Sequence, residues 1–192
     1  MPFDTTVEGS DEALLVLYAN GDPAAARILT LRLTPRIVGF AARVLSDRAE
    51  AEDVAQEAML RLWRIAPAWR QDQARISTWL YRVASNLCTD RLRRRRSVPL
   101  DTITEPEDGR VEPVAGMIEQ ERAAALQAAL AVLPERQRQA VVLRHLEGLT
   151  NPQIAEVLGI GVEAVESLTA RGKRALAAIL AGRREELGYD DA

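Results

Sequence analysis

One stretch of the chain, residues 78–96, combines an apolar helical face with a concentration of arginine. Five apolar side chains recur along it near helical spacing: Trp79, Leu80, Val83, Leu87 and Leu92. This spacing predicts an amphipathic helix packed against a core, with Ser77 as its N-terminal cap. The stretch carries six arginines and one aspartate, whereas the whole chain has a formal net charge of −3. Such a basic surface in an acidic protein favours an anionic partner, and nucleic acid is the first candidate.

The arginine run that ends this stretch, Arg93–Arg96, has two interpretations. Cations near a helix C-terminus are stabilised by the helix dipole, so the run also suits a solvated helix end with no ligand. Two neighbours favour nucleic acid: Asn86 on the same helix, and Trp69 in the preceding loop, residues 66–77. An asparagine amide can read adenine, and an aromatic ring can stack on an unpaired base.

The rest of the chain has the composition of a helical protein. Hydrophobic residues make up 47% of it and aromatic residues only 4%. The abundance of alanine and leucine favours packed helices, and no segment alternates apolar and polar residues in the manner of a strand. We therefore predict an all-α fold. The length of 192 residues suits one domain or two small ones.

Three absences in the sequence narrow the class of protein. The single cysteine, Cys88, excludes an internal disulfide and offers no metal-ligand spacing, so we expect a small buried thiol and neither metal nor cofactor. The N-terminal segment is acidic and lacks the apolar centre of a signal peptide. No stretch approaches 18 consecutive apolar residues. We expect a soluble, cytoplasmic protein without membrane insertion.

Capping residues and prolines divide the N-terminal half into helices. Asp22-Pro23 and Thr34-Pro35 each place a capping side chain before a proline, which is favoured at the first helical position. Because proline inside a helix removes a hydrogen bond, the second pair predicts two helices, about 23–33 and 35–45, instead of one. Asp47 then caps the next helix.

The helix that begins after Asp47 has a dense polar face. Its most prominent members are Asp53, Gln56, Glu57 and Arg61. Taken alone, this pattern is typical of an ordinary solvated helix with ion pairs four residues apart, such as Glu57 with Arg61.

Residues 98–116 separate two helical regions. This segment contains three prolines, two glycines and five acidic residues and has no helical periodicity, so it predicts a flexible acidic linker. Beyond it, Asn151-Pro152 begins a short helix, Gly159 ends it, and a longer helix starts at Val162. A short helix, a glycine turn and a longer helix form a helix-turn-helix, whose second helix enters the major groove of DNA.

Two long segments resemble the same protein family. DRAEAEDVAQEAMLRLWRIAPAWR (Asp47–Arg70), followed by ISTWLYRVASNLCTDRLRRRR (Ile76–Arg96), closely resembles the promoter-melting domain of the extracytoplasmic-function (ECF) sigma factors of bacterial RNA polymerase, in the sigma-70 family. LPERQRQAVVLRHLEGLTNPQIAEVLGIGVEAVESLTARGKRAL (Leu133–Leu176) resembles the domain of that family that reads the −35 promoter element. The two domains occur in the family's order across a linker, which is more specific than either match alone.

The resemblance implies an architecture and a function. Residues 1–97 would form the domain that binds core polymerase and the −10 element, residues 117–192 would form the helix-turn-helix domain that binds the −35 element, and residues 98–116 would link them. The chain would recognise promoters and direct their melting and the initiation of transcription. Members of the family are commonly inhibited by an anti-sigma protein held against both domains.

The resemblance also assigns roles to individual residues. Core polymerase would contact the chain through the clamp of its largest subunit and the flap of its second-largest subunit. The clamp would bind the polar helix face described above: Asp53, Gln56, Glu57 and Arg61. The residues expected at the −10 element, from the base-capturing loop and the basic helix, are Trp69, Arg70, Ile76, Ser77, Arg82, Asn86, Arg91, Arg93 and Arg94.

The second domain has a matching set of expected DNA contacts. They lie at the start of the short helix and along the recognition helix: Thr150, Asn151, Ala164, Ser167, Arg171, Lys173 and Arg174. The sequence departs from the family here, because Glu166 stands where a basic residue is most common and Glu163 adds a second carboxylate. An acid near DNA repels phosphate unless it accepts a hydrogen bond from cytosine N4.

Two other classes of protein compete with this interpretation. An enzyme would need a catalytic constellation, but the only histidine, His145, is far in sequence from the acidic helix, and no nucleophile motif or phosphate-binding loop is present. A stand-alone helix-turn-helix regulator would leave the AEDVAQE block and the basic helix unexplained. We therefore expect no catalytic activity and favour the sigma factor.

Overall fold

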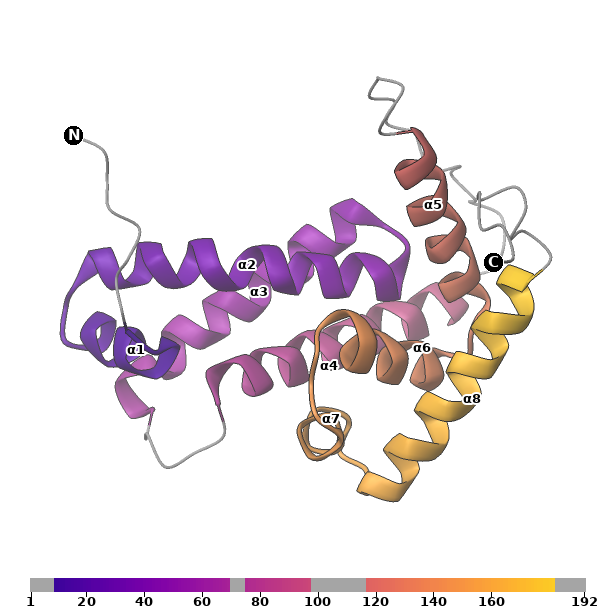
Figure 1. Ribbon diagram of the computed structural model, residues 1–192. Coiled ribbons are helices and arrows are strands. Elements are labelled where there is room, and N and C mark those ends of the chain that lie inside the picture. Colours follow the sequence, from indigo (N-terminus) through magenta and orange to yellow (C-terminus); the bar gives the residue numbers. More distant parts are fainter. Residues whose placement is uncertain (1–8, 70–74, 98–116, 182–192) are drawn as a thin grey trace.

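The computed structural model describes residues 9–69, 75–97 and 117–181, and every regular element within these ranges is a helix (Figure 1). This confirms the predicted all-α fold. In chain order the elements are α1 (Asp11–Ala19), α2 (Pro23–Leu45), α3 (Arg48–Ile65), the 3-10 turn η1 (Ala66–Ala68), α4 (Ile76–Ser97), α5 (Met117–Val132), α6 (Glu135–Val141), the π-helical η2 (Val142–Leu146), α7 (Asn151–Leu158) and α8 (Val162–Ala181).

Local side-chain caps fix where the first helices begin. Asp22 accepts a hydrogen bond from the backbone N–H of Ala24 at 2.8 Å, and Asp47 accepts one from Glu50 at 2.9 Å. Both caps confirm the sequence prediction. The predicted cap at Ser77 is wrong, because α4 already begins at Ile76 and Ser77 lies in its first turn.

The predicted break at Pro35 is also wrong. A single helix, α2, runs for 23 residues through this proline. Its buried side chains Leu29, Leu33, Ile37 and Phe40 continue on one face from before the proline to beyond it. Packing of this continuous apolar face keeps the helix whole although the proline removes one backbone hydrogen bond.

Helices α1–α4 form one packed group. The long helices α2 and α3 lie side by side, and α4 crosses beneath both (Figure 1). Phe40 of α2 and Tyr81 of α4 meet edge to face with ring centroids 5.5 Å apart, and each is almost completely buried. Trp63 and Trp79 are partly buried and pack against this core, and for Trp79 this agrees with its place on the predicted apolar face.

Helices α5–α8 form the second group. Gly159 ends α7 with a φ of +64°, a left-handed conformation that glycine adopts without steric cost, and α8 follows after a short turn. This confirms the predicted helix-turn-helix. Gly172 of α8 faces α6 so closely that an added Cβ would lie 2.5 Å from Val141 Cγ2 and 3.3 Å from the Gln137 carbonyl oxygen.

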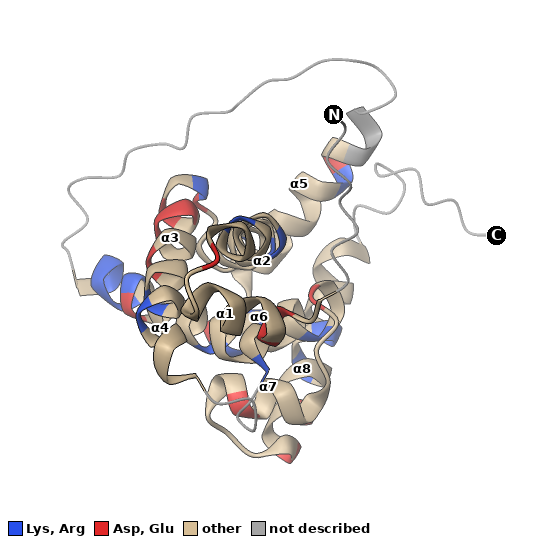
Figure 2. Cartoon of the chain, turned by 90° about the vertical axis from the view of Figure 1, so that its left-hand side faces the viewer, with Lys and Arg blue, Asp and Glu red and all other residues tan. Residues whose placement is uncertain are grey.

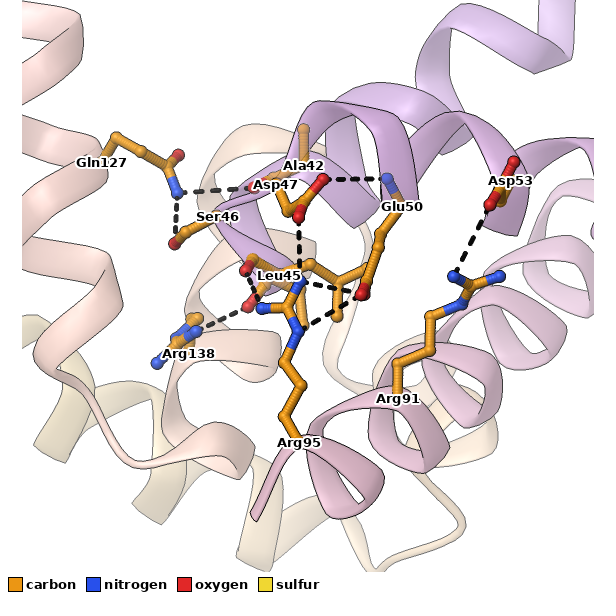
Figure 3. Close-up of polar contacts among 11 residues, drawn as sticks. Ala42, Leu45, Ser46, Asp47, Glu50, Asp53, Arg91, Arg95, Gln127 and Arg138 are labelled. Carbon is orange, nitrogen blue, oxygen red and sulfur yellow. Dashed lines mark hydrogen bonds and ion pairs between the residues drawn. The ribbon is translucent and has the colours of Figure 1, made fainter. Parts of the chain in front are cut away.

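The two groups pack against each other. Helix α7 contacts α4, and α5 contacts α2. At the centre of this junction the C-terminal end of α2 accepts hydrogen bonds from three different helices (Figure 3). The donors are Arg95 of α4, Gln127 of α5 and Arg138 of α6.

A line of polar contacts extends this junction along α4. Tyr81, Ser85 and Thr89 project at intervals of four residues, and each donates a hydrogen bond to the second group. The acceptors are Glu147 at 2.5 Å, Gln139 at 2.7 Å and Glu135 at 2.7 Å, respectively. We call these six residues the polar seam.

The contact at Gly172 gives a stability prediction. Gly172→Ala should lower the free energy of unfolding by about 1–3 kcal/mol, because overpacking against Val141 outweighs the better helix propensity of alanine. Urea unfolding of the full chain followed by circular dichroism measures this change.

The matched control removes the obstructing methyl groups. In a Val141→Ala background, Gly172→Ala should lower the free energy of unfolding much less than it does in the native background. An equal cost in both backgrounds would show that the close approach of α8 and α6 is not the cause.

Candidate nucleic-acid interface

Helix α4 presents three faces with different surroundings. Leu80, Ala84 and Cys88 are completely buried in the core of the first group. The polar seam occupies a second face. The third face is exposed to solvent and carries Arg82 and Asn86, two of the side chains expected to contact DNA. Helix periodicity thus separates the candidate binding face from both packing faces.

The arginines at the end of α4 divide into two pairs. Arg95 binds the Leu45 carbonyl oxygen at 2.9 Å and forms ion pairs with Asp47 at 3.2 Å and Glu50 at 2.9 Å (Figure 3). Arg96 pairs with Glu135 of α6 at 3.1 Å. Arg93 and Arg94 are exposed, and no side-chain partner is found for either within the described parts of the chain. Figure 2 shows basic residues gathered toward one end of α4. The available basic surface is therefore smaller than the run of four arginines suggests.

Arg91 of α4 contacts the polar face of α3. Its guanidinium is 3.9 Å from the carboxylate of Asp53 in α3 (Figure 3). Arg91 is expected to bind DNA and Asp53 to bind polymerase, so the two expected binding surfaces touch at this pair. The Asp53 side chain remains 68% exposed, and exposed pairs at this distance contribute little stability. Either residue can exchange this contact for an external partner at low cost.

The loop before α4 packs against the core. Trp69 packs edge to face on Trp79 with ring centroids 6.2 Å apart, and its buried indole N–H meets no acceptor among the described residues. Ile76 is completely buried, which corrects its expected role: the side chain supports the loop from the core and offers no surface to DNA in this arrangement. Ser77 is partly exposed, and Arg70 lies outside the described residues.

The polar face of α3 is open to solvent. Glu57 accepts a hydrogen bond from Arg61 at 2.8 Å, and this bond lowers the pKa of the Glu57 carboxyl group. Gln56 is exposed beside Leu60, whose side chain is 45% exposed. Gln56 and Leu60 also line a groove between α2 and α3. A single exposed leucine is common on protein surfaces, so the mixed charges of this face and the adjoining groove are its distinguishing features.

In the second group, the basic part of α8 is exposed. Arg171 and Arg174 lie three residues apart with Ala164 and Lys173 also at the surface, and Ser167 is partly exposed. Lys173 borders an apolar hollow with His145 and Leu146 of η2. Burial, followed by the charge of Lys173, lowers the pKa of His145.

Side-chain hydrogen bonds occupy the start of α7, where Thr150 and Asn151 are expected to contact DNA. The Thr150 N–H donates to Gln153 Oε1 at 2.9 Å in a capping box, so it is not free to bind a phosphate. Asn151 instead extends its side-chain amide to Glu166 of α8, with Nδ2 and Oε1 3.5 Å apart.

The residues that join the two groups were not among those predicted from the sequence. Arg138 is only 9% exposed and Gln139 only 2%, although both are polar. Periodic apolar residues could not indicate them. One feature of the sequence could have indicated this contact: Glu135 and Gln139 are four residues apart, as are their partners Thr89 and Ser85 on α4.

The described residues contain neither a helix long and apolar enough to cross a membrane nor a group of three possible metal-binding side chains. Cys88 is buried as expected, and burial raises the pKa of its thiol to about 12. The thiol is therefore protonated and unreactive at neutral pH.

Two family models match the chain. Sigma-70 region 2 matches residues 29–98, and Sigma-70, region 4 matches residues 123–176. The first range contains α4 and most of α2, and the second contains the helix-turn-helix.

Curated relatives agree with these matches over nearly the full chain. The RNA polymerase sigma-H factor of Pseudomonas aeruginosa is 33% identical over 177 residues, covering 86% of this chain and 91% of the relative. The ECF RNA polymerase sigma factor SigM of Mycobacterium tuberculosis is 37% identical over 174 residues, covering 90% of this chain and 86% of the relative.

Solved structures have a similar fold. CnrH, solved in complex with the cytosolic domain of CnrY, has a TM-score of 0.68 and 24% identity, covering 91% of this chain and 99% of CnrH. The sigma factor RpoE, in complex with the anti-sigma factor NepR from Bartonella quintana, has a TM-score of 0.65 and 22% identity. The match covers 79% of this chain and 94% of RpoE. From the two family matches and the identity with curated relatives, this chain belongs to the ECF sigma factors of the sigma-70 family.

Proposed function

We propose that the chain binds core RNA polymerase and directs it to promoters through two DNA-binding modules. The observation that carries the proposal is that each matched sigma region presents an exposed basic helix surface, one on α4 and one on α8. The chain acts by binding and not by catalysis, and it works in the cytoplasm, where bacterial polymerase meets the chromosome.

The first module, residues 1–97, would engage the −10 element. Arg82 and Asn86 face solvent together on α4, so both can approach duplex edges at the start of the melted region. Arg93 and Arg94 would hold phosphates, an interaction that depends on salt and not on sequence. The loop from Trp69 to Ser77 would receive an extruded base, whose unstacking costs a few kcal/mol that stacking in the loop must offset.

The second module, residues 117–192, would engage the −35 element. Helix α8 would enter the major groove, with Arg171 and Arg174 on its exposed side gripping phosphates or a guanine edge. The polar face of α3 would bind the polymerase clamp through Asp53, Gln56, Glu57 and Arg61, because a mixed charged face suits a specific protein contact.

We also propose that the two modules separate when the chain works. The two elements are centred about 25 base pairs apart, which is roughly 85 Å of B-DNA. A compact chain of this length has a radius of gyration of about 16 Å. Packed together, the modules therefore cannot reach both elements at once, and the linker, residues 98–116, must let them part across the polar seam.

An anti-sigma protein would shift the equilibrium between the packed and the separated arrangement of the modules. The RpoE structure, which resembles this chain in fold, was solved with the anti-sigma factor NepR. A protein that binds only the packed form stabilises it by mass action and thereby lowers the population of separated modules.

Run-off transcription tests the function directly. Core polymerase with the full chain should initiate at specific sites on genomic fragments from the chain's own source, whereas core alone should not. Equal initiation with and without the chain, in the absence of any inhibitor, would contradict the function.

A first prediction concerns the polymerase contact. The double change Asp53→Ala with Gln56→Ala should weaken binding to core polymerase about five- to tenfold, because losing two ordinary interface contacts should cost about 1–1.4 kcal/mol in total. Surface plasmon resonance with immobilised core enzyme measures the affinity. Glu121→Ala, which removes an exposed charge of the second module, is the control and should bind normally.

A second prediction concerns the −35 contact. Arg171→Ala with Arg174→Ala should weaken promoter binding by the holoenzyme and reduce the slope of log affinity against log salt by about one for each lost phosphate contact. Arg27→Ala, an exposed arginine of α2, should leave the slope unchanged. A slope that stays constant in the double variant would place the contacts elsewhere.

A third prediction concerns the separation of the modules. Glu135→Lys with Glu147→Lys would set like charges against Arg96 and Arg43, which now pair with these carboxylates. The radius of gyration of the free chain, measured by X-ray scattering, should increase while the helix content stays constant. Glu121→Lys with Glu156→Lys reverses two exposed charges as a control, and an equal increase in both variants would contradict the prediction.

A further inference from the structure

The charges along the recognition helix are ordered. Two carboxylates, Glu163 and Glu166, occupy its first two turns, and the basic residues Arg171, Lys173 and Arg174 follow. All five side chains are exposed. In a helix-turn-helix, the N-terminal residues of the second helix meet base edges. Glu166, which the Asn151 amide orients, is therefore placed among the residues that read bases.

The rotation of α8 about its axis is fixed by packing. Val165 is completely buried, and Gly172, two turns later, lies against α6. Glu166 is consequently held at the surface, on the side of α8 that faces the start of α7. There the Asn151 amide reaches its carboxylate at 3.5 Å. This contact sets the direction of the Glu166 side chain while leaving carboxylate lone pairs free to accept further hydrogen bonds.

A carboxylate in the major groove can accept hydrogen bonds but cannot donate them. Guanine presents two acceptors there, and thymine presents an acceptor and a methyl group, so both repel or fail to bind it. Adenine offers one donor, but its N7 acceptor lies beside that donor. Cytosine offers the N4 amino donor without a neighbouring acceptor of its own. Of the four bases, cytosine therefore suits an acidic side chain best.

We propose that Glu166 reads a cytosine of the −35 element through its N4 amino group, with Asn151 as the positioning residue. The proposal rests on the proposed function, because it needs α8 in the major groove of promoter DNA. Repulsion by the phosphates lowers affinity equally for every sequence, whereas the acceptors on guanine, thymine and adenine oppose the carboxylate at this position only, so the acid contributes specificity more than affinity.

The test uses the full chain bound to core polymerase and a promoter library randomised across the −35 element. Sequencing of the bound fraction should show the native holoenzyme preferring cytosine at one position by about five- to tenfold, the lower part of the range for a specific base contact. Glu166→Ala should remove the preference at that position and leave the other positions unchanged. Glu166→Gln should shift it toward adenine, because glutamine both donates and accepts.

Glu163→Ala is the matched control, because it removes an equal charge one turn earlier on the same helix. The cytosine preference should survive this change. Thermal unfolding of each variant verifies that the chain is folded, which an exposed site such as Glu166 should allow.

Three results would overturn the inference: an unchanged base profile in Glu166→Ala, a loss of preference in Glu163→Ala as well, or a uniform rise in affinity for all sequences. The last would mean that the carboxylate only repels DNA. A native holoenzyme that selects no sequence at all would instead contradict the proposed function, so the two failures are distinguishable.

Discussion

The C-terminal end of α2 is the point on which the arrangement of the whole molecule depends. A helix leaves its last four carbonyl groups without intrahelical partners. Here Gln127 donates to the carbonyls of Ala42 and Arg43, Arg138 donates to that of Val44 at 2.5 Å, and Arg95 donates to that of Leu45 at 2.9 Å. The donors come from α5, α6 and α4, so one helix end orients helices of both modules (Figure 3). Two of the three donors are cations, which the helix dipole favours at this end.

These contacts explain how the modules can be both packed and separable. Arg138 is buried and also binds the carbonyls of Ala131 and Leu133 in its own module, so three backbone oxygens offset the desolvation that lowers the pKa of its guanidinium. The polar seam likewise consists of hydrogen bonds, and it lies beside apolar contacts, because buried apolar residues of both groups belong to one continuous core cluster. Hydrogen bonds broken at such an interface are replaced by bonds to water, so their net contribution is only about 0.5–1.5 kcal/mol each. The seam therefore adds little to the cost of parting the modules, which is set by the apolar contacts between them.

The sequence predicted features that depend on neighbouring residues and missed those that depend on distant ones. The caps at Asp22 and Asp47 and the glycine end of α7 were predictable because each is a contact within a few residues. The uninterrupted α2 was not, since the packing that keeps it straight through Pro35 involves other helices. The side chains proposed to contact DNA were assigned through the family pattern, but no pattern showed that Arg95 binds the end of α2 while Arg93 stays exposed.

The three faces of α4 determine which of its side chains remain accessible when the modules are packed together. The seam uses Tyr81, Ser85 and Thr89, whereas Arg82 and Asn86 lie on a different face and are exposed in the packed arrangement. The basic side of α8 is exposed as well. Packing therefore leaves Arg82, Asn86 and the basic side of α8, the surfaces proposed to bind DNA, uncovered; it limits the distance between them. A packed chain could touch one promoter element but not both, so the linker and the seam together would control cooperation between two individually weak contacts.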